Sequence, residues 1–374
     1  MIRRYDPWLL ILTMALVALG LAEVYSASTF IASEQSGNPY HYIERQGFAA
    51  MVGFGLLWGL ARTPYRRLPR YAPWLYGFAV VALTLVWVPG LGHSAGGASR
   101  WFGVAGIHFQ PAEFVKVVVL IGLASWLHRN RGDVNDPYVL GMAALGLAVP
   151  LGLIIAQPDF GSFLIICVLC GIMVFLAGLR MRWVAILGAI GAAGLAVVAV
   201  AEPYRVKRLT SFLDPFADCS GAGYQVCQSL LALHHGGIAG QGPGESVAKL
   251  LYLPEPYNDF IAAILGEEFG LGGMIGLLCL YGAFALRGIS IARRAPDLFG
   301  TLLATTFTVM IVGQACLNLG VVMSVVPPKG LVLPFLSYGA SAMMVNLAAV
   351  GVLLSVSAEA HEEKTAPVPE GARV

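Results

Sequence analysis

Charge is what this sequence lacks most. Only 12% of its 374 residues are charged, whereas 57% are hydrophobic and the mean hydropathy is +0.74. A soluble domain carries about 25% charged residues, so this chain has too little polar surface to cover a globule in water. The net charge of +2 gives no reason to expect nucleic acid as a partner. The composition predicts an integral membrane protein surrounded by membrane lipids.

The sequence also lacks a cysteine framework and any metal-ligand spacing. Four of the six cysteines lie in apolar stretches as small apolar filler: Cys167, Cys170, Cys279 and Cys316. Cys219 and Cys227 share a polar loop. They could pair in an oxidising space, but their separation also suits two unpaired thiols.

Long apolar runs are abundant, and a bilayer span needs roughly 20 mainly apolar residues. Ten segments qualify: 8–31, 46–61, 72–90, 109–127, 138–156, 160–178, 182–201, 260–286, 299–325 and 338–357. We therefore expect an all-α polytopic membrane protein with about ten transmembrane helices. Residues 1–358 form one membrane domain, and the polar tail 359–374 is predicted to be disordered.

The basic residues are distributed unequally between the two sides. With the N-terminus inside, cytoplasmic segments hold fifteen of the 23 lysines and arginines. The positive-inside rule then places both termini in the cytoplasm. The basic N-terminus runs into an apolar segment without a clean cleavage site, which is typical of a retained first helix.

The long connection 202–258, between the seventh and eighth segments, is the largest extracytoplasmic loop. Unstructured loops of this size are uncommon unless they are functional. Within it, YQVCQSLLALHHGG has an apolar stripe at Val226, Leu230 and Leu233, which predicts a short helix on the outer leaflet. The glycine-rich GGIAGQGPGES that follows is more typical of a flexible loop than of a phosphate cradle.

Three polar residues follow one another at the start of the fourth segment. Gln110, Glu113 and Lys116 recur at intervals of three, so they lie roughly along one helix face. A buried Glu–Lys pair either locks two helices together or forms the polar wall of a cavity in which Lys116 meets an anion. The sequence favours neither alternative.

Outer cations stand where basic residues are disfavoured: Arg100, Arg205, Lys207, Arg208, Lys249 and Lys329. Lipid headgroups could attract some of them. A cluster facing a cavity would instead suit a pyrophosphate, because guanidinium and ammonium groups neutralise phosphate oxygens.

Asp259 is the first candidate for chemistry. The segment KLLYLPEPYNDF brings it through a proline-marked loop to the mouth of the eighth apolar helix. A carboxylate at a membrane boundary loses solvation, so it needs a partner or a task. Asp159 is expected to cap the sixth helix, and Ser337 either caps the last helix or lines a cavity, the cap being favoured.

In this order the motifs resemble the SEDS family (shape, elongation, division and sporulation proteins). The matching stretches are YSAS at Tyr25, RW and QPAEFVK from Arg100 to Lys116, QPDFGS from Gln157, LPEPYNDFIAAILGEEFG and PPKGLVLPFLSYGAS. The KGL within the last motif is more similar to the division-type branch, FtsW, than to the elongation-type branch, RodA. Small departures, such as Ala112 and Asn258 where the family usually has Ser and Thr, remove no charged position.

The resemblance implies a peptidoglycan glycosyltransferase that polymerises lipid II at the outer face of the bacterial cytoplasmic membrane and releases undecaprenyl pyrophosphate. It implies Asp259 as the general base in an inverting reaction. It also implies Arg, Lys and a divalent cation such as Mg²⁺ around the phosphates, and a class B penicillin-binding protein as the partner. From it we take Arg100, Gln110, Glu113, Lys116, Arg205, Arg208, Lys249, Lys329 and Ser337 as candidate substrate-binding residues.

Two other functions are compatible with the residues. Ten spans with charges at depth also describe a transporter of lipid-linked sugars, a flippase, although polar sequence gathered on one side fits alternating access poorly. The third hypothesis is a non-catalytic scaffold that recruits wall enzymes.

Overall fold

The computed structural model describes residues 4–88, 92–95, 98–104, 107–200, 212, 214–216, 219–221, 223–250, 252–327 and 330–365. In this part of the chain ten long helices correspond to the ten predicted segments. They are α1 (Pro7–Ser36), α2 (His41–Arg62), α3 (Leu68–Leu85), α4 (Pro111–Arg129), α5 (Pro137–Ala156), α6 (Phe160–Leu176), α7 (Met181–Val200), α10 (Ile261–Arg294), α11 (Leu298–Val322) and α12 (Ala340–Thr365).

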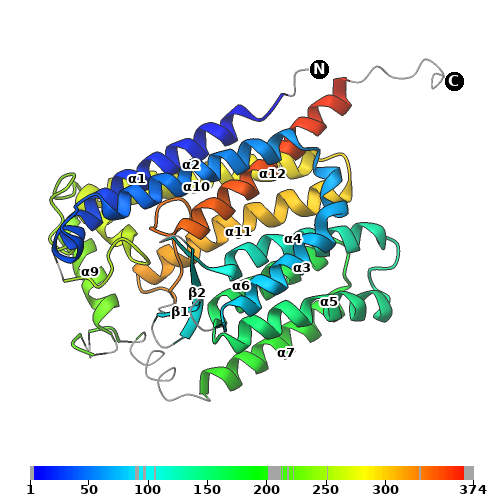
Figure 1. The fold of residues 1–374 in the computed structure, drawn as a ribbon, viewed down its shortest axis with the longest axis horizontal. Helices are drawn as coiled ribbons and strands as arrows, with labels where there is room; N and C mark the ends of the chain where they lie inside the picture. The colour runs from blue at the N-terminus through cyan, green and yellow to red at the C-terminus, as the bar shows by residue number, and fades with distance from the viewer. Residues whose placement is uncertain are drawn as a thin grey trace.

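The helices run side by side in one bundle (Figure 1). Among the described residues, six helices are long and apolar enough to cross a membrane: α1, α4, α5, α10, α11 and α12. The chain is therefore a multi-pass, predominantly helical membrane protein, as its composition predicts. Helix α9 (Tyr224–Gly236) lies at one end of the bundle, and the start of α1 and the end of α12 lie at the other.

Aspartates define where several helices begin. Asp6 Oδ1 accepts a hydrogen bond from the Leu9 amide at 3.0 Å, and Pro7 is the first residue of α1. Asp136 and Asp297 cap α5 and α11 in the same way. Each carboxylate satisfies an amide that has no partner within the helix, and proline costs nothing at the first position.

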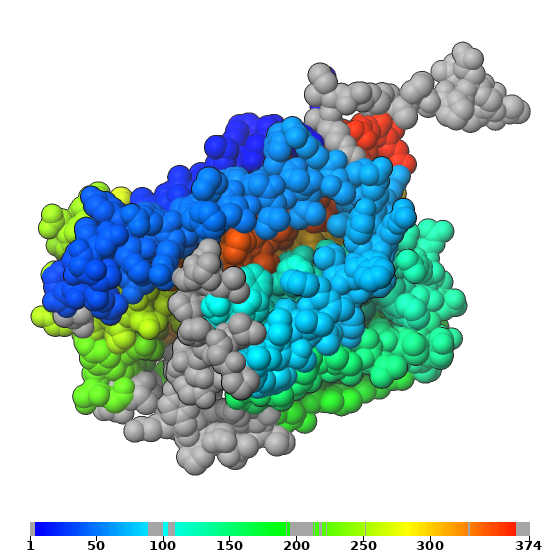
Figure 2. Space-filling model, in the orientation of Figure 1, coloured from blue at the N-terminus to red at the C-terminus, as the bar shows by residue number. Residues whose placement is uncertain are grey.

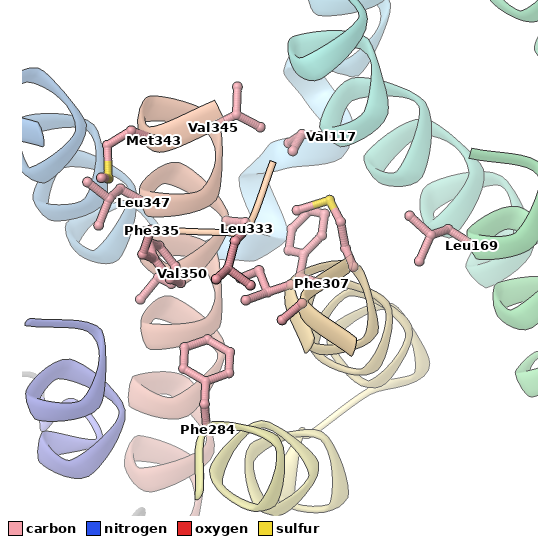
Figure 3. Packing of buried hydrophobic residues seen from close by; sticks show 14 of the residues in the cluster. Val117, Leu169, Phe284, Phe307, Leu333, Phe335, Met343, Val345, Leu347 and Val350 are labelled. Atoms are coloured by element: carbon pink, nitrogen blue, oxygen red, sulfur yellow. The ribbon is translucent and has the colours of Figure 1, made fainter. Parts of the chain in front are cut away.

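The centre of the bundle is formed by α11, α12 and α4, which are largely buried. Phe307 of α11, Phe284 of α10 and Leu347 of α12 surround the chain segment that carries Leu333 and Phe335 (Figure 3). In the space-filling view the orange C-terminal segment is seen only in a recess between blue and cyan segments (Figure 2). The segment before α12 is thus held inside the bundle by apolar packing.

The peripheral helices expose large apolar side chains. Tyr138 and Leu145 of α5 are 68% and 63% exposed, and Ile190 of α7 is 65% exposed. Such surfaces are costly in water but not in lipid. They are the faces of the bundle that contact the membrane.

A small antiparallel sheet, which the sequence analysis did not predict, precedes α4. Its strands are β1 (Gly92–Ala95), β2 (Ala98–Val104) and β3 (Ile107–Phe109), in the order β1-β2-β3. Phe102 pairs with Phe109, and their ring centroids are 5.2 Å apart. The strands are too short and too rich in glycine to give a clear alternating pattern. The sheet delivers Arg100 and Gln110 to the start of α4.

The long connection between α7 and α10 contains the predicted short helix, α9. Cys227 of this helix forms a disulfide with Cys219, with Cα atoms 5.6 Å apart. This settles the pairing that the sequence left open. Residues 201–210 of this connection lie outside the described residues.

The predicted tail begins too early. Helix α12 continues to Thr365, so the first residues of the segment predicted to be disordered are helical. Glu359 and Glu363 lie 3.4 and 3.6 Å from Arg66 of the short 3₁₀ helix η1 (Tyr65–Arg67). A prediction from hydropathy ends the helix before these charged residues, although they continue it. Residues 366–374 lie outside the described residues.

Gly20 is where α1 approaches the segment before α12. A Cβ atom at this position would lie 2.1 Å from the Phe335 carbonyl oxygen. We expect Gly20→Ala to destabilise the protein by about 1–3 kcal/mol, because backbone cannot move aside as a side chain can. Gly55 of α2 has nothing within 4 Å of that position, so Gly55→Ala should leave stability unchanged or raise it slightly. Melting of both detergent-solubilised variants tests this, and equal melting temperatures would contradict it.

Candidate functional site

Asp259 lies half-buried just before α10. Its backbone carbonyl accepts a hydrogen bond from Asn318 Nδ2 at 2.7 Å, and the same amide donates to the Leu331 carbonyl at 2.6 Å. Asn318 is buried on α11. A Cβ atom on Gly330 would lie 3.0 Å from Asp259 Oδ2, so the side chain faces the segment that follows α11. One buried amide therefore fixes both the backbone of Asp259 and its neighbouring segment.

Lys116 is connected to the same segment through Gln314 of α11. Its ammonium lies 2.9 Å from Glu113 Oε2 and donates to Gln314 Oε1 at 3.2 Å. Gln314 in turn donates to the Val332 carbonyl at 2.9 Å. Lys116 is only 1% exposed. The predicted Glu–Lys pair is present, and its burial favours the structural alternative over a lysine that is free to meet an anion.

Arg100, Gln110 and Asp159 form a third group. Gln110 Nε2 donates to Asp159 Oδ2 at 3.0 Å, and the Gln110 amide donates to Ser341 Oγ. Asp159 also accepts from the Ser162 amide at 3.1 Å, which confirms it as the cap of α6. Arg100 is half-buried and donates to the carbonyls of residues 157 and 158. The strand β2, the start of α4 and the start of α6 are thus tied together.

Ser337 does not cap the last helix, so the favoured prediction for it is wrong. Its hydroxyl accepts a hydrogen bond from the Leu333 amide at 2.7 Å, and its carbonyl accepts from Gln46 Nε2 at 3.0 Å. The side chain is 4% exposed. It stabilises the turn that α2 holds against the bundle, and such burial argues against a contact with substrate.

Lys249 belongs to a separate cluster. Its ammonium lies 2.9 Å from Glu268 Oε1 and 3.0 Å from Ser26 Oγ. These contacts satisfy a cation that was expected to face phosphate, so we leave Lys249 out of the candidate site. Four of the six predicted outer cations lie outside the described residues: Arg205, Lys207, Arg208 and Lys329.

Sequence reasoning missed a group of three tyrosines beside Asp259. Tyr257 donates to the Tyr42 hydroxyl at 3.0 Å, and Tyr338 packs edge-on against both rings. The Tyr338 amide also donates to the Tyr257 carbonyl at 2.8 Å. Burial raises the pKa of Tyr257 well above its ordinary value, and the hydrogen bond with Tyr42 adds to the effect. Tyr257 therefore stays a neutral donor. Its place two residues before Asp259 was the only signal in the sequence.

Among the residues that the structure describes, no group of three or more His, Cys, Asp or Glu side chains could hold a metal ion. The divalent cation stays a prediction.

The arrangement around Asp259 suits general base catalysis. A half-buried carboxylate is held on a fixed backbone beside a segment that three buried polar side chains position: Asn318, Gln314 and Lys116. A fixed position is what general base catalysis requires of such a carboxylate.

Known proteins match nearly the whole chain. Residues 7–362 match the model of the family of FtsW, RodA and SpoVE, described as cell cycle proteins. The probable peptidoglycan glycosyltransferase FtsW of Coxiella burnetii is 39% identical over 361 residues, which cover 95% of this chain and 96% of that protein. Stage V sporulation protein E of Bacillus subtilis is 38% identical, with 94% and 96% covered.

Solved structures also match nearly the whole chain. One, from work described as "Structural coordination of polymerization and crosslinking by a peptidoglycan synthase complex", matches with a TM-score of 0.78 and 30% identity, covering 96% of this chain and 99% of that chain. The rod shape determining protein RodA of Thermus thermophilus matches with a TM-score of 0.70 and 28% identity, covering 94% and 96%. A further structure of that RodA is of a variant with an aspartate replaced by alanine.

Proposed function

Because the chain belongs to the FtsW, RodA and SpoVE family of cell cycle proteins, we propose that it is a SEDS-type peptidoglycan glycosyltransferase. Its substrate is lipid II, its products are a β-1,4-linked glycan strand and undecaprenyl pyrophosphate, and its role is in cell division or cell shape. The observation that carries the proposal is the half-buried Asp259, whose backbone Asn318 fixes against the segment before α12.

The reaction needs few protein groups. A sugar hydroxyl is a poor nucleophile at neutral pH, so Asp259 takes its proton as the acceptor oxygen bonds to the anomeric carbon of the donor. The bond from that carbon to the diphosphate breaks at the same time, and the electron pair leaves with undecaprenyl pyrophosphate. The α-linkage becomes a β-linkage, so configuration inverts. Diphosphate is a good leaving group, and no protonated acid is required.

Charge that develops on the departing diphosphate must be neutralised. Arg100 suits this role, because its described contacts are to two carbonyl oxygens and leave its positive charge available to an anion. Arg205, Arg208 and Lys329 stay in the proposal as outer cations. Lys116 is left out because Glu113 already neutralises it.

The proposed orientation places both termini in the cytoplasm and Asp259 at the outer face. The excess of basic residues in the segments on one side supports it. A class B penicillin-binding protein is the proposed partner. The match to a chain of a synthase complex that couples polymerisation and crosslinking supports this partner.

Purified protein incubated with lipid II tests the activity. We expect glycan strands of increasing length on a gel, formed either by the protein alone or after addition of the penicillin-binding protein. The same protein in vesicles with fluorescent lipid II tests the alternative, since a flippase would move the headgroup without forming polymer. A preparation that forms no glycan with or without its partner would contradict the proposal and favour the scaffold.

A further inference from the structure

A cavity lies between α1 and the first turns of α10. Its volume is about 550 Å³, and the segment that carries Pro243, Gly244 and Lys249 closes one side of it. Glu268 lies in the second turn of α10, whereas Asp259 precedes the helix, and neither Asp259 nor Asn318 lines this cavity. The cavity is therefore distinct from the candidate catalytic site, and nothing in the proposed reaction uses it.

The floor of the cavity is polar and its donors are occupied. An ammonium has three N–H donors, and Lys249 directs them to Ser26 Oγ, the Gly244 carbonyl and Glu268 Oε1. The Ser26 hydroxyl donates to Glu268 Oε1 at 2.6 Å, and the Gly244 amide donates to Glu268 Oε2 at 2.8 Å. In this part of the described structure the donors of Lys249, Ser26 and Gly244 are therefore engaged within the protein.

Glu23 provides the unused acceptor. It lines the cavity, is 2% exposed, and its Oε2 is buried without a hydrogen-bond partner among the residues that the structure describes. Lys249 forms its ion pair with Glu268, and no contact with Glu23 is present among the described residues. A buried unpaired carboxylate oxygen is costly unless a cation or a donor reaches it. The cavity lacks one positive, hydrogen-bond-donating group.

The walls indicate where such a group comes from. Tyr25 and Phe30 of α1 and Phe269 of α10 line the cavity and are 42%, 39% and 37% exposed. They lie on membrane-spanning helices, so their exposed faces meet lipid. A ligand that enters here arrives from the bilayer and brings an apolar chain with it.

We propose that this cavity binds a lipid with a primary ammonium in its headgroup, of the phosphatidylethanolamine class. The ammonium donates to Glu23 Oε2, and an acyl chain lies along Phe30 and Phe269. The lipid then joins α1 to the loop that precedes α10, and its ammonium supplies the positive charge that Glu23 needs. This binding does not depend on the proposed glycosyl transfer.

Native mass spectrometry of the full chain in mixed micelles tests the proposal. We expect one phosphatidylethanolamine to be retained in preference to phosphatidylglycerol. Glu23→Gln should weaken that retention roughly 10- to 100-fold, since the acceptor loses the negative charge that strengthens its hydrogen bond to an ammonium. Glu34→Gln, an exposed change of the same charge on the same helix, should leave it unaltered.

A second variant tests the same cavity without changing any charge. Ala22→Trp adds a large ring at an exposed wall position of the cavity and should also abolish retention, while the melting temperature shows that the protein remains folded. Equal retention of the two lipids by the wild type would overturn the proposal, as would unchanged retention by both Glu23→Gln and Ala22→Trp.

Discussion

Asp259→Asn should lower the rate of lipid II polymerisation by about 100- to 10,000-fold, the usual contribution of a positioned general base. Asparagine has nearly the same shape, but its amide cannot accept the proton of the acceptor hydroxyl. The hydrogen bond from Asn318 goes to the backbone carbonyl of residue 259 and does not require the carboxylate. The fold should therefore survive, and the loss should fall on the chemical step.

The measurement is the initial rate of glycan formation from purified lipid II, with the melting temperature of each variant beside it. Glu245→Gln is a suitable control, because Glu245 is exposed in the connection that leads to Asp259 and its substitution removes the same charge. The control should retain the wild-type rate. Polymerisation by Asp259→Asn at more than a tenth of the wild-type rate would mean that another group takes the proton.

The helices could be predicted because their signals are local. Apolar runs located all ten, and Asp159 was recognised as a cap because its partner, the Ser162 amide, lies three residues ahead. The Glu113–Lys116 pair was found for the same reason. Helix ends were less accurate. Helix α10 continues to Arg294 and α12 to Thr365, because hydropathy fails where charged residues continue a helix.

Contacts between distant parts of the chain could not be predicted. Lys249 was expected to face phosphate, but its partner Ser26 comes from the first helix. Gln110 and Asp159 meet across 49 residues of sequence. The tyrosines beside Asp259 come from α2, the loop before α10 and the segment before α12. Periodicity relates residues within one helix, so only the packing of the bundle reveals such pairs.

Lys116→Met should destabilise the protein by about 3–5 kcal/mol, because it leaves Glu113 buried without its cation. Lys116 is 1% exposed and Glu113 is 7% exposed, so neither charge can turn to water. The change also removes the donor to Gln314, which positions the segment facing Asp259. Loss of activity should follow loss of structure. Resistance of the purified protein to unfolding by denaturant measures the first effect.

A second substitution separates structure from chemistry at this pair. The double variant Glu113→Gln, Lys116→Met removes both charges at nearly constant volume, and replacing a whole buried pair is often close to neutral. It should recover most of the stability and most of the polymerisation rate if Lys116 only holds α4 to α11. A double variant that is stable but inactive would instead show that the Lys116 ammonium contacts the diphosphate, and the charge that neutralises the leaving group would have to be reassigned from Arg100.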